Sequence, residues 1–321
     1  MKGPEFLIGD RYRVFLKGII SLIVSGGLLA ALFLYFDAEI SRQIFNIFSV
    51  SSWALVISVM FFWVMFSVSA ARYRWVLKCM ILSAPSFWLI AKIHVLITFL
   101  GHFLPIGLAA EAVRIGIGRL QLGLGYGTAT ASVIYDRIFG LFGIVGLGLL
   151  MLPVQIIRGI SHPLVLLQLV AWVVLLLIMC LGVSIVVMFI PRNKSPWIRI
   201  NEDFEAFVKN LKLKGVLSHI CFALFMGLSY SAVVWVLILG FDYKIEFFDV
   251  FQFSALFLFA QNLPFLYQGW GGREAVIVGV FSTTGFLDTS QALSISIAVG
   301  VAMLISTLPG SFLWRIIKKS R

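Results

Sequence analysis

Six stretches of this chain stay apolar for about as long as a helix needs to cross a membrane. A bilayer core about 30 Å thick requires roughly 20 apolar residues in helical conformation. The stretches are 15–36, 53–71, 128–152, 164–190, 216–239 and 293–314. Of the 321 residues 61% are apolar and 12% are charged, whereas a soluble domain has roughly 45–50% apolar and about 25% charged residues. The sequence therefore predicts an all-α polytopic membrane protein with six full spans, and it excludes soluble enzyme folds.

Two further apolar stretches, 87–118 and 247–285, are interrupted by proline, glycine and ionisable residues. Unpaired backbone groups cannot face lipid, because each costs several kcal/mol there. A break at membrane depth must therefore be buried in protein or line a wet cavity. We expect both stretches to be broken re-entrant helical hairpins.

The basic residues predict the orientation. Most of the 25 Lys and Arg residues fall on one side of the expected spans if the N-terminus is cytoplasmic, including Arg72, Arg74 and Lys78 in a loop after the second span. Both termini are then cytoplasmic, and each broken stretch enters and leaves the membrane on the same side. The net charge of +11 is accounted for by cytoplasmic loops, so no nucleic-acid partner is expected.

The expected organisation is one transmembrane domain, 1–321. Its first half covers about 50–155 and its second half about 216–321. Between them, 191–215 is a basic cytoplasmic loop in which 201–214 has the pattern of an amphipathic helix on the membrane surface. An ordinary solvated loop helix is the alternative for that segment.

The two broken stretches resemble each other. Leu-Pro occurs at 104–105 and at 263–264, and Glu-Ala-Val opens an apolar segment at 111–113 and at 274–276. By the charge rule the first stretch enters from the cytoplasm and the second from outside, so the halves are predicted to form an inverted repeat. Interrupted segments at corresponding positions of two inverted halves indicate a transporter-type site near the midplane. The alternative is chance, because both motifs are short and made of common residues.

The second break has the composition of an anion-binding site. Pro264 ends one half-helix, and glycines that include Gly271 and Gly272 permit a tight reversal. A new half-helix is predicted to begin at about Arg273, with its positive dipole end facing the break. Pro105, Gly107 and a helix beginning near Ala110 repeat this arrangement in the first stretch.

Ionised residues near the breaks are costly in lipid and commonly mark a pathway or a pair. Arg273, which follows Trp270, is predicted to hold an anionic headgroup, and Glu274 to cap the half-helix or carry a proton. The plainer interpretation is that Glu274 only complements the helix N-terminus. Glu111 and Arg114 share a helix face, as an intrahelical ion pair or as part of the same site.

Asp136 and Arg137 are consecutive, so on a helix they point in different directions and each needs a distant partner. Asp136 with Arg114 or Arg273, and Arg137 with Glu111 or Glu274, are the pairings left open. Tyr135 is placed to hydrogen-bond the same network.

Other polar residues in apolar surroundings have plainer interpretations. Lys92 lies near the cytoplasmic end of its stretch, and His102 is expected to be buried and hydrogen-bonded. His219 and Asp249 are expected at the membrane interface. Gly140 begins a series of glycines at every third residue, which predicts close helix packing.

No hydrolase, metalloprotease or nucleotide-binding motif occurs in the sequence, and His and Cys show no metal-ligand spacing. We therefore expect no catalytic residue, cofactor or metal, and an enzymatic activity of the chain alone is not predicted.

The segments 101–119 and 132–137, with Leu263-Pro264 and Gly271-Gly272-Arg273-Glu274-Ala275, resemble the lysylphosphatidylglycerol synthase transmembrane region, a flippase-like family. The likeness covers nearly the whole chain. This chain lacks the Gly-x that the family inserts before Arg-Glu, and it has Ala-Ala-Glu where Gly-Glu is usual. Relatives that synthesise the lipid carry an additional soluble aminoacyl-transfer domain, which is not expected in this chain.

The resemblance implies that the chain moves lipids or lipid-linked saccharides between leaflets of a bacterial or archaeal cytoplasmic membrane. The expected partner is an anionic membrane lipid or lipid-linked glycan. The alternative function is a subunit that presents lipid to a separate headgroup transferase, and a plain structural scaffold is the third. The oligomeric state is left open.

Overall fold

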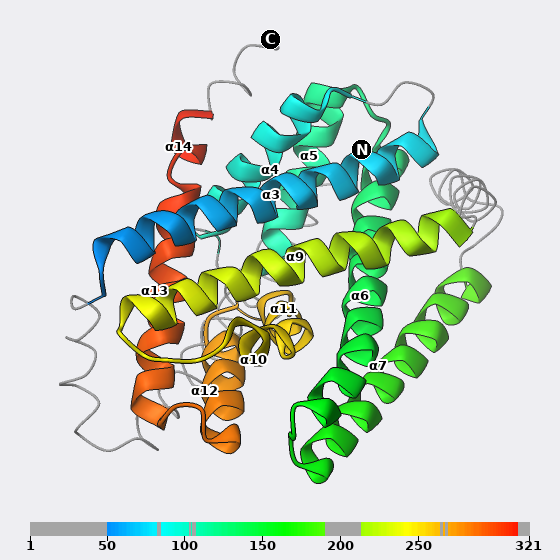
Figure 1. Cartoon of the computed structure of the whole chain (residues 1–321). Coiled ribbons are helices and arrows are strands. Elements are labelled where there is room, and N and C mark those ends of the chain that lie inside the picture. Colours follow the sequence, from blue (N-terminus) through cyan, green and yellow to red (C-terminus); the bar gives the residue numbers. More distant parts are fainter. Residues whose placement is uncertain are drawn as a thin grey trace, which may run out of the picture.

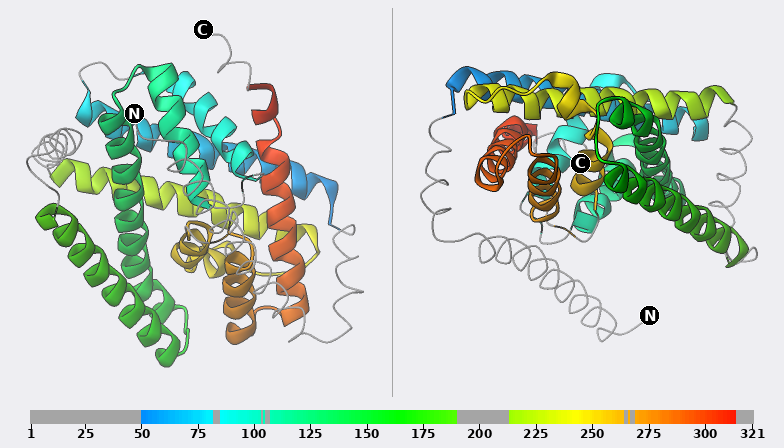
Figure 2. Two further views of the ribbon diagram at one scale, coloured as in Figure 1. Left: turned by 180° about the vertical axis from the view of Figure 1, so that it is seen from behind. Right: turned by 60° about the horizontal axis from the view of Figure 1, so that its bottom comes forward.

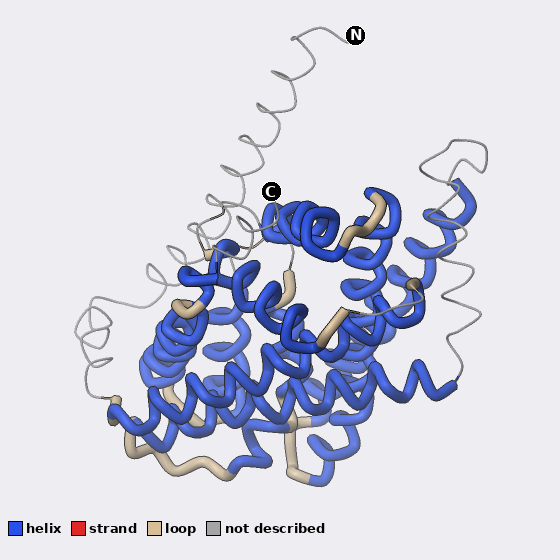
Figure 3. Tube along the Cα trace, turned by 90° about the horizontal axis from the view of Figure 1, so that it is seen from above, coloured by secondary structure: helices blue, strands red, loops and turns tan. Residues whose placement is uncertain are grey.

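The computed structural model describes residues 50–81, 85–102, 104, 107–189, 213–263, 266 and 269–313. Throughout these residues the regular structure is helical. The helices are α3 (Ser52–Met80), α4 (Phe87–Gly101), α5 (Gly107–Leu122), α6 (Tyr126–Ile157), α7 (His162–Phe189), α9 (Leu213–Gly240), α10 (Phe247–Phe251), α11 (Ser254–Gln261), α12 (Gly272–Thr284), α13 (Thr289–Thr307) and α14 (Gly310–Leu313). Short loops join most consecutive helices (Figure 3).

Five helical segments are long and apolar enough to cross a membrane, which confirms the predicted class. They are Ser52–Met80, Tyr126–Ile157, Pro163–Leu181, Leu217–Gly240 and Thr289–Leu313. Each coincides with one of the predicted spans. The remaining predicted span, 15–36, lies outside the described residues, as do residues 201–212 of the predicted amphipathic helix.

The helices α3 and α9 pack along each other in antiparallel directions. The amide of Ser51, before α3, donates a hydrogen bond of 3.0 Å to the carbonyl oxygen of Gly240, at the end of α9. A Cβ at Gly240 would lie 2.4 Å from the Cβ of Ala54, so only glycine permits this approach. The two helices form one layer, and helices α6, α7, α12 and α13 lie below it in the right-hand view of Figure 2.

Both interrupted stretches are broken helices, as predicted. The first consists of α4 and α5, and the second of α10, α11 and α12. The half-helix predicted at about Arg273 begins at Gly272, and the one predicted near Ala110 begins at Gly107. In Figure 1, α5 leads upward to the top end of α6, whereas α12 leads downward to the bottom end of α13.

The two broken stretches have different neighbours. The helix α4 packs against α3 and α13, and α5 packs against α6. The helix α11 packs against α9 and α6, and α12 packs against α13. Each broken stretch is thus held between the α3–α9 layer and the helices α6 and α13.

The prediction that Arg72 lies in a cytoplasmic loop is wrong. The helix α3 continues to Met80, because Tyr73, Val76 and Leu77 extend its apolar face and are buried. Arg72 is therefore a buried helical residue. Its guanidinium lies inside the protein, where it needs a counterion.

Candidate functional site

Two sets of charged residues lie close to the helix breaks, and most of them are buried. The first set consists of Arg72 from α3, Glu111 and Arg114 from α5, and Asp136 and Arg137 from α6. We call it the first charge cluster. It contains four of the predicted site residues, and Arg72 in addition.

Asp136 is the centre of the first charge cluster. Its Oδ1 accepts a hydrogen bond of 3.0 Å from Arg72 Nε, and its Oδ2 accepts bonds of 3.3 Å from Arg72 Nη2 and 2.9 Å from Arg114 Nη1. The pairing of Asp136 with Arg114 is therefore confirmed, and that with Arg273 is not formed. The pairing with Arg72 was missed, because Arg72 was assigned to a loop. The apolar residues after Arg72, continued at helical spacing, were the signal for a longer helix.

Neighbouring side chains hold these two arginines in place. The ring of Tyr73 lies 3.7 Å from Arg114 Cζ, and its hydroxyl is 3.0 Å from that of Ser132. A Cβ at Gly140 would lie 2.7 Å from Arg72 Nη1. The glycine expected to serve helix packing thus also leaves room for a guanidinium.

Arg137 connects the two broken stretches. Its Nη2 donates to Glu111 Oε1, at the start of α5, and its Nη1 donates a bond of 3.1 Å to the amide oxygen of Asn262, at the end of α11. The predicted pairing with Glu111 is confirmed, and the alternative with Glu274 is not formed. As the consecutive positions require, Arg137 and Asp136 face different partners.

The first charge cluster has an excess of positive charge. It holds three guanidinium groups and two carboxylates, so its formal charge is +1. Arg114 is only 5% exposed, and its Nη2 has no hydrogen-bond partner among the described residues. Glu111 Oε2 lies 3.5 Å from Arg114 Nη1, which is long for a hydrogen bond. A buried cation donor without a partner is costly, and it is the kind of group that binds an anion.

The second set lies at the start of α12 and contains Arg273 and Glu274, which are 1% and 0% exposed. Glu274 Oε2 accepts a bond of 2.6 Å from the amide of Gly271, so the carboxylate caps the helix, which is one of the two roles predicted for it. Glu274 Oε1 accepts from Arg273 Nε at 3.0 Å and from Arg273 Nη2. Because Glu274 bends back toward the N-cap, two consecutive residues meet here although they diverge in a helix interior. We call Trp270, Gly271, Gly272, Arg273 and Glu274 the second charge cluster.

The geometry of the second charge cluster depends on glycines. Gly271 has φ +85°, a left-handed conformation that glycine adopts at little cost. A Cβ at Gly272 would lie 2.3 Å from the Leu266 side chain, and one at Gly300 would lie 2.5 Å from Arg273 Nη2. The ring of Trp270 covers the guanidinium of Arg273, with 4.6 Å from its centroid to Cζ.

The ten predicted site residues therefore do not form one network. Within the described residues, the hydrogen bonds and ion pairs of Arg273 and Glu274 stay in the second charge cluster or reach Ser296 on α13. The bond from Arg137 to Asn262 is where the first charge cluster touches the second broken stretch. Tyr135 is buried against Val76 and Ala131.

His219, which was expected at the membrane interface, is buried inside the protein. His219 is 3% exposed, and its ring lies 4.8 Å from that of Trp75 and 5.0 Å from that of Phe139. The close approach of α6 and α9 buries it, since a Cβ at Gly143 would lie 2.9 Å from the His219 carbonyl oxygen.

The other polar residues lie as follows. His102 is hydrogen-bonded, with Nδ1 2.9 Å from the Thr98 carbonyl oxygen, and Lys92 is exposed. Asp249 Oδ1 lies 3.5 Å from Nη1 of Arg158, the residue that follows α6. In the part of the chain that the structure describes, no group of three or more His, Cys, Asp or Glu residues is placed to hold a metal ion.

Comparison with known proteins identifies one family. The sequence model of that family, described as the lysylphosphatidylglycerol synthase TM region, matches residues 18–310. No curated protein matches the chain.

Proposed function

This chain belongs to the lysylphosphatidylglycerol synthase TM-region family, and we propose that it binds an anionic lipid, or a lipid-linked saccharide, and carries it across the membrane. The protein is a multi-pass membrane protein. We place it in the cytoplasmic membrane, with both termini in the cytoplasm. The translocation site lies between the halves 50–155 and 216–321, which we take to be inverted relative to each other.

The observation that carries this proposal is the unpartnered Nη2 of Arg114 in a cluster of formal charge +1. A guanidinium binds phosphate through charge-assisted hydrogen bonds, and these are strong where water is excluded. Arg114 keeps its position through Asp136 and the ring of Tyr73. A phosphate at Nη2 would therefore bind a donor that is already oriented.

The inverted arrangement is supported by the way the helices pack. Exchanging α3 with α9, α4 with α11, α5 with α12 and α6 with α13 turns the contacts of α4 with α3, α5 and α13, and of α5 with α6, into other observed contacts, whereas the contacts of α4 with α14 and of α10 with α9 have no counterpart. The opposite courses of α5 and α12 in Figure 1 agree with this exchange.

The two charge clusters take different parts in this proposal. Glu274 already neutralises Arg273 and caps α12, so we assign the phosphate to Arg114 and not to Arg273. Arg137 joins α5 to α11 and is 44% exposed in its side chain. A rocking motion of one half against the other would break its bond to Asn262 and open the path toward Arg273.

A leaflet-resolved translocation assay in proteoliposomes tests the proposal. Labelled phosphatidylglycerol, lysylphosphatidylglycerol and phosphatidylcholine are the lipids, with and without an ion gradient. Arg114→Gln leaves Asp136 paired with Arg72, and Glu111 paired with Arg137, so folding is expected to survive. We expect this variant to lower the rate for the phosphatidylglycerols by about ten- to a hundredfold, the effect of one lost charged hydrogen bond.

Arg158→Gln is the matched control, because Arg158 pairs with Glu246 at the surface, outside both charge clusters. It is expected to translocate lipid as the wild type does. Arg273→Ala, measured beside it, reports whether the second charge cluster takes part. Equal rates for the wild type and Arg114→Gln, with both folded, would show that Arg114 does not bind the lipid. Wild-type rates equal to those of empty liposomes would show that the protein does not translocate these lipids.

A second function is favoured by the family's description, which names the transmembrane region of a synthase. In that case the chain presents lipid to a separate soluble aminoacyl- or glycosyltransferase and does not translocate it. Adding such a transferase to proteoliposomes distinguishes the two. Headgroup modification that requires this chain, without translocation, would favour the second function.

A further inference from the structure

Three buried glutamines meet near the end of α6 where α7 begins, far from the first charge cluster (Figure 1). Gln155 belongs to α6, Gln168 belongs to α7, and Gln252 follows α10. They are 1%, 6% and 1% exposed. The distance from Asp136 to Gln155 along α6 is about 28 Å, from the helical rise of about 1.5 Å per residue. We call the three residues the glutamine cluster, and the proposed phosphate site does not include it.

Hydrogen bonds determine how each side-chain amide of the glutamine cluster is oriented. Gln155 Nε2 donates a bond of 2.9 Å to the backbone carbonyl of Gln252 and one of 3.1 Å to Gln168 Oε1. Gln252 Nε2 donates a bond of 3.2 Å to the backbone carbonyl of Asp249. Because a backbone carbonyl only accepts, the nitrogens of Gln155 and Gln252 must face these carbonyls, and the oxygen of Gln168 must then face Gln155.

The other atom of each amide has no partner. Within the described residues, Gln155 Oε1, Gln168 Nε2 and Gln252 Oε1 are buried and make no hydrogen bond. The same is true of Nε1 of Trp172, which lies one helical turn after Gln168 in α7 and is 3% exposed. Buried polar groups nearly always have a partner, in the protein or in ordered water, because leaving the bond unmade is costly. The cluster and Trp172 thus offer two acceptors and two donors to a ligand.

These four atoms suit a neutral hydroxyl group. A hydroxyl donates to an amide oxygen and also accepts from an amide or indole N–H, so it can serve both kinds of atom. A phosphate diester only accepts and an ammonium group only donates, so each would leave half of the atoms unpaired. The glutamine cluster therefore differs in its ligand chemistry from Arg114, whose free donor suits an anion.

Polar groups extend from the protein surface to the glutamine cluster. Asp249, whose carbonyl oxygen binds Gln252, has a side chain that is 18% exposed, and the nearby side chain of Glu246 is 73% exposed. Gln155 lies in the last turn of α6, which ends at Ile157. The cluster thus lies just beneath a charged part of the surface.

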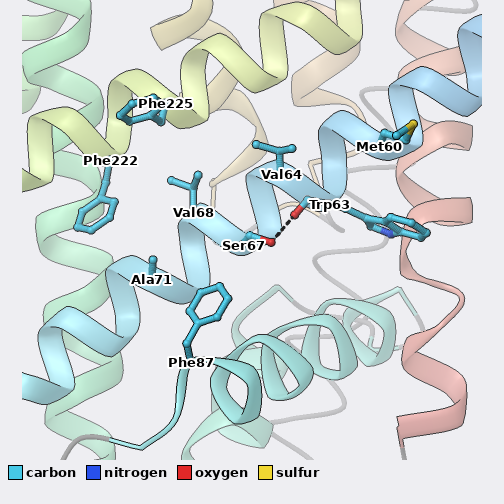
Figure 4. A pocket seen from close by; sticks show the side chains of 9 residues that line it. All are labelled: Met60, Trp63, Val64, Ser67, Val68, Ala71, Phe87, Phe222 and Phe225. Atoms are coloured by element: carbon cyan, nitrogen blue, oxygen red, sulfur yellow. Dashed lines mark hydrogen bonds between the residues drawn. The ribbon is translucent and has the colours of Figure 1, made fainter.

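The apolar groove between α3 and α9 has no such unpartnered atoms (Figure 4). Its volume is about 560 Å³, and the polar side-chain atoms of its lining are already bonded. The Ser67 hydroxyl donates a bond of 2.8 Å to the carbonyl oxygen of Trp63, and Trp63 Nε1 donates one of 3.0 Å to the carbonyl oxygen of Ser306. The groove therefore indicates no particular ligand, whereas the glutamine cluster does.

We propose that the glutamine cluster, together with Trp172, binds neutral hydroxyl groups, supplied by ordered water or by the headgroup of a lipid. The binding of headgroup hydroxyls rests on the proposed function, and the binding of water does not. In the proposed orientation the cluster lies on the outer side of the membrane, at the opposite end of α6 from Arg114. A glycerol or sugar headgroup carries several hydroxyls, so the cluster would add selection for such headgroups to the selection for charge.

Radiolytic footprinting of the full chain in lipid nanodiscs tests for water. Hydroxyl radicals formed from bound water label the side chains beside it, and mass spectrometry identifies them. Met151 lies one turn before Gln155 in α6 and is 8% exposed, and Met65 in α3, which is 7% exposed, is the control of equal burial. We expect Met151 and Trp172 to be labelled several-fold faster than Met65.

A pair of lipids tests for headgroup hydroxyls. Phosphatidylglycerol and phosphatidylpropanol carry the same phosphate diester, but only the first has free hydroxyls. If headgroup hydroxyls bind, the wild type translocates phosphatidylglycerol several-fold faster, and Gln168→Met abolishes this difference. Gln168→Met removes an unpartnered donor and leaves Gln155 bonded to the carbonyl of Gln252. The same exchange at Gln291, in the first turn of α13, is the control and is expected to keep the difference.

The two measurements distinguish the sources. Fast labelling without a lipid preference assigns the hydroxyls to water, and a preference that Gln168→Met abolishes assigns them to the headgroup. Neither result, in folded protein, would overturn the proposal. Trp172→Phe, which removes only the indole donor, replaces Gln168→Met if that variant does not fold. Fast labelling in a protein that translocates neither lipid would defeat the proposed function alone, and translocation with neither fast labelling nor preference would defeat this inference alone.

Discussion

Asp136 is the residue on which the buried charges depend. It is almost completely buried, and it accepts hydrogen bonds from two arginines on two different helices. A buried ion pair adds little net stability compared with apolar residues, yet removing one partner leaves an uncompensated charge. Here one carboxylate serves two guanidinium groups, so its loss leaves Arg72 without a carboxylate and leaves Arg114 only the Glu111 carboxylate 3.5 Å away.

Asp136→Asn is therefore expected to lower the free energy of unfolding by about 3–5 kcal/mol, the usual cost of breaking a buried pair. Arg114→Gln is expected to lower the free energy of unfolding by less, because each carboxylate of the first charge cluster keeps one arginine. Unfolding in detergent micelles, followed by tryptophan fluorescence, measures both. An Asp136→Asn protein as stable as the wild type would show that the buried charges are not balanced as described.

The sequence predicted part of this arrangement for a physical reason. Consecutive residues of a helix diverge, so Asp136 and Arg137 had to find separate partners, and two of the four pairings considered are those observed. Arg72 was missed because a charge after an apolar run was assigned to a loop. The pairing of Arg273 with its neighbour was missed because the rule for helix interiors does not hold in a first turn.

Single glycines of α6 determine how closely this helix packs against α9. A Cβ at Gly143 would lie 2.9 Å from the His219 carbonyl oxygen and 3.0 Å from the Ala223 Cβ, atoms that cannot move without shifting α9. Three residues further on, a Cβ at Gly146 would lie 3.6 Å from Ile220, an ordinary contact. The same helix thus offers a test position and its control.

Gly143→Ala is expected to lower the free energy of unfolding by about 1–3 kcal/mol through overpacking. Gly146→Ala is expected to raise it by about 0.5–1 kcal/mol, because alanine loses less backbone entropy in a helix. Thermal unfolding of the two purified variants measures the difference. Equal stabilities of the two variants would mean that α9 can shift at His219 without a cost in free energy.

The helix breaks were predictable to within a few residues, because proline and glycine act locally. Gly269 and Gly271 have positive φ angles at the second break, where the sequence predicted a reversal. The length of α3 was harder to predict. The apolar residues Tyr73, Val76 and Leu77 continue the helical spacing, but other helices decide whether they are buried.

The proposed translocation requires that the two broken stretches enter the membrane from opposite sides. Only then do α5 and α12 begin in the interior and lead to opposite surfaces, and only then does a motion of one half against the other expose the site alternately. The turn before Tyr126 would face the cytoplasm, and the end of α12 at Thr283 would face the outside.

The most direct measurement is the sidedness of these two positions. In a protein without Cys79, Cys180 and Cys221, the single substitutions Tyr126→Cys and Thr283→Cys place one thiol at each exposed end. Sealed vesicles of one orientation are treated with a membrane-impermeant maleimide from outside, or after loading it inside. We expect the thiol at 126 to react only from the cytoplasmic side and the thiol at 283 only from the opposite side. Reaction of both thiols from the same side would contradict the inverted arrangement.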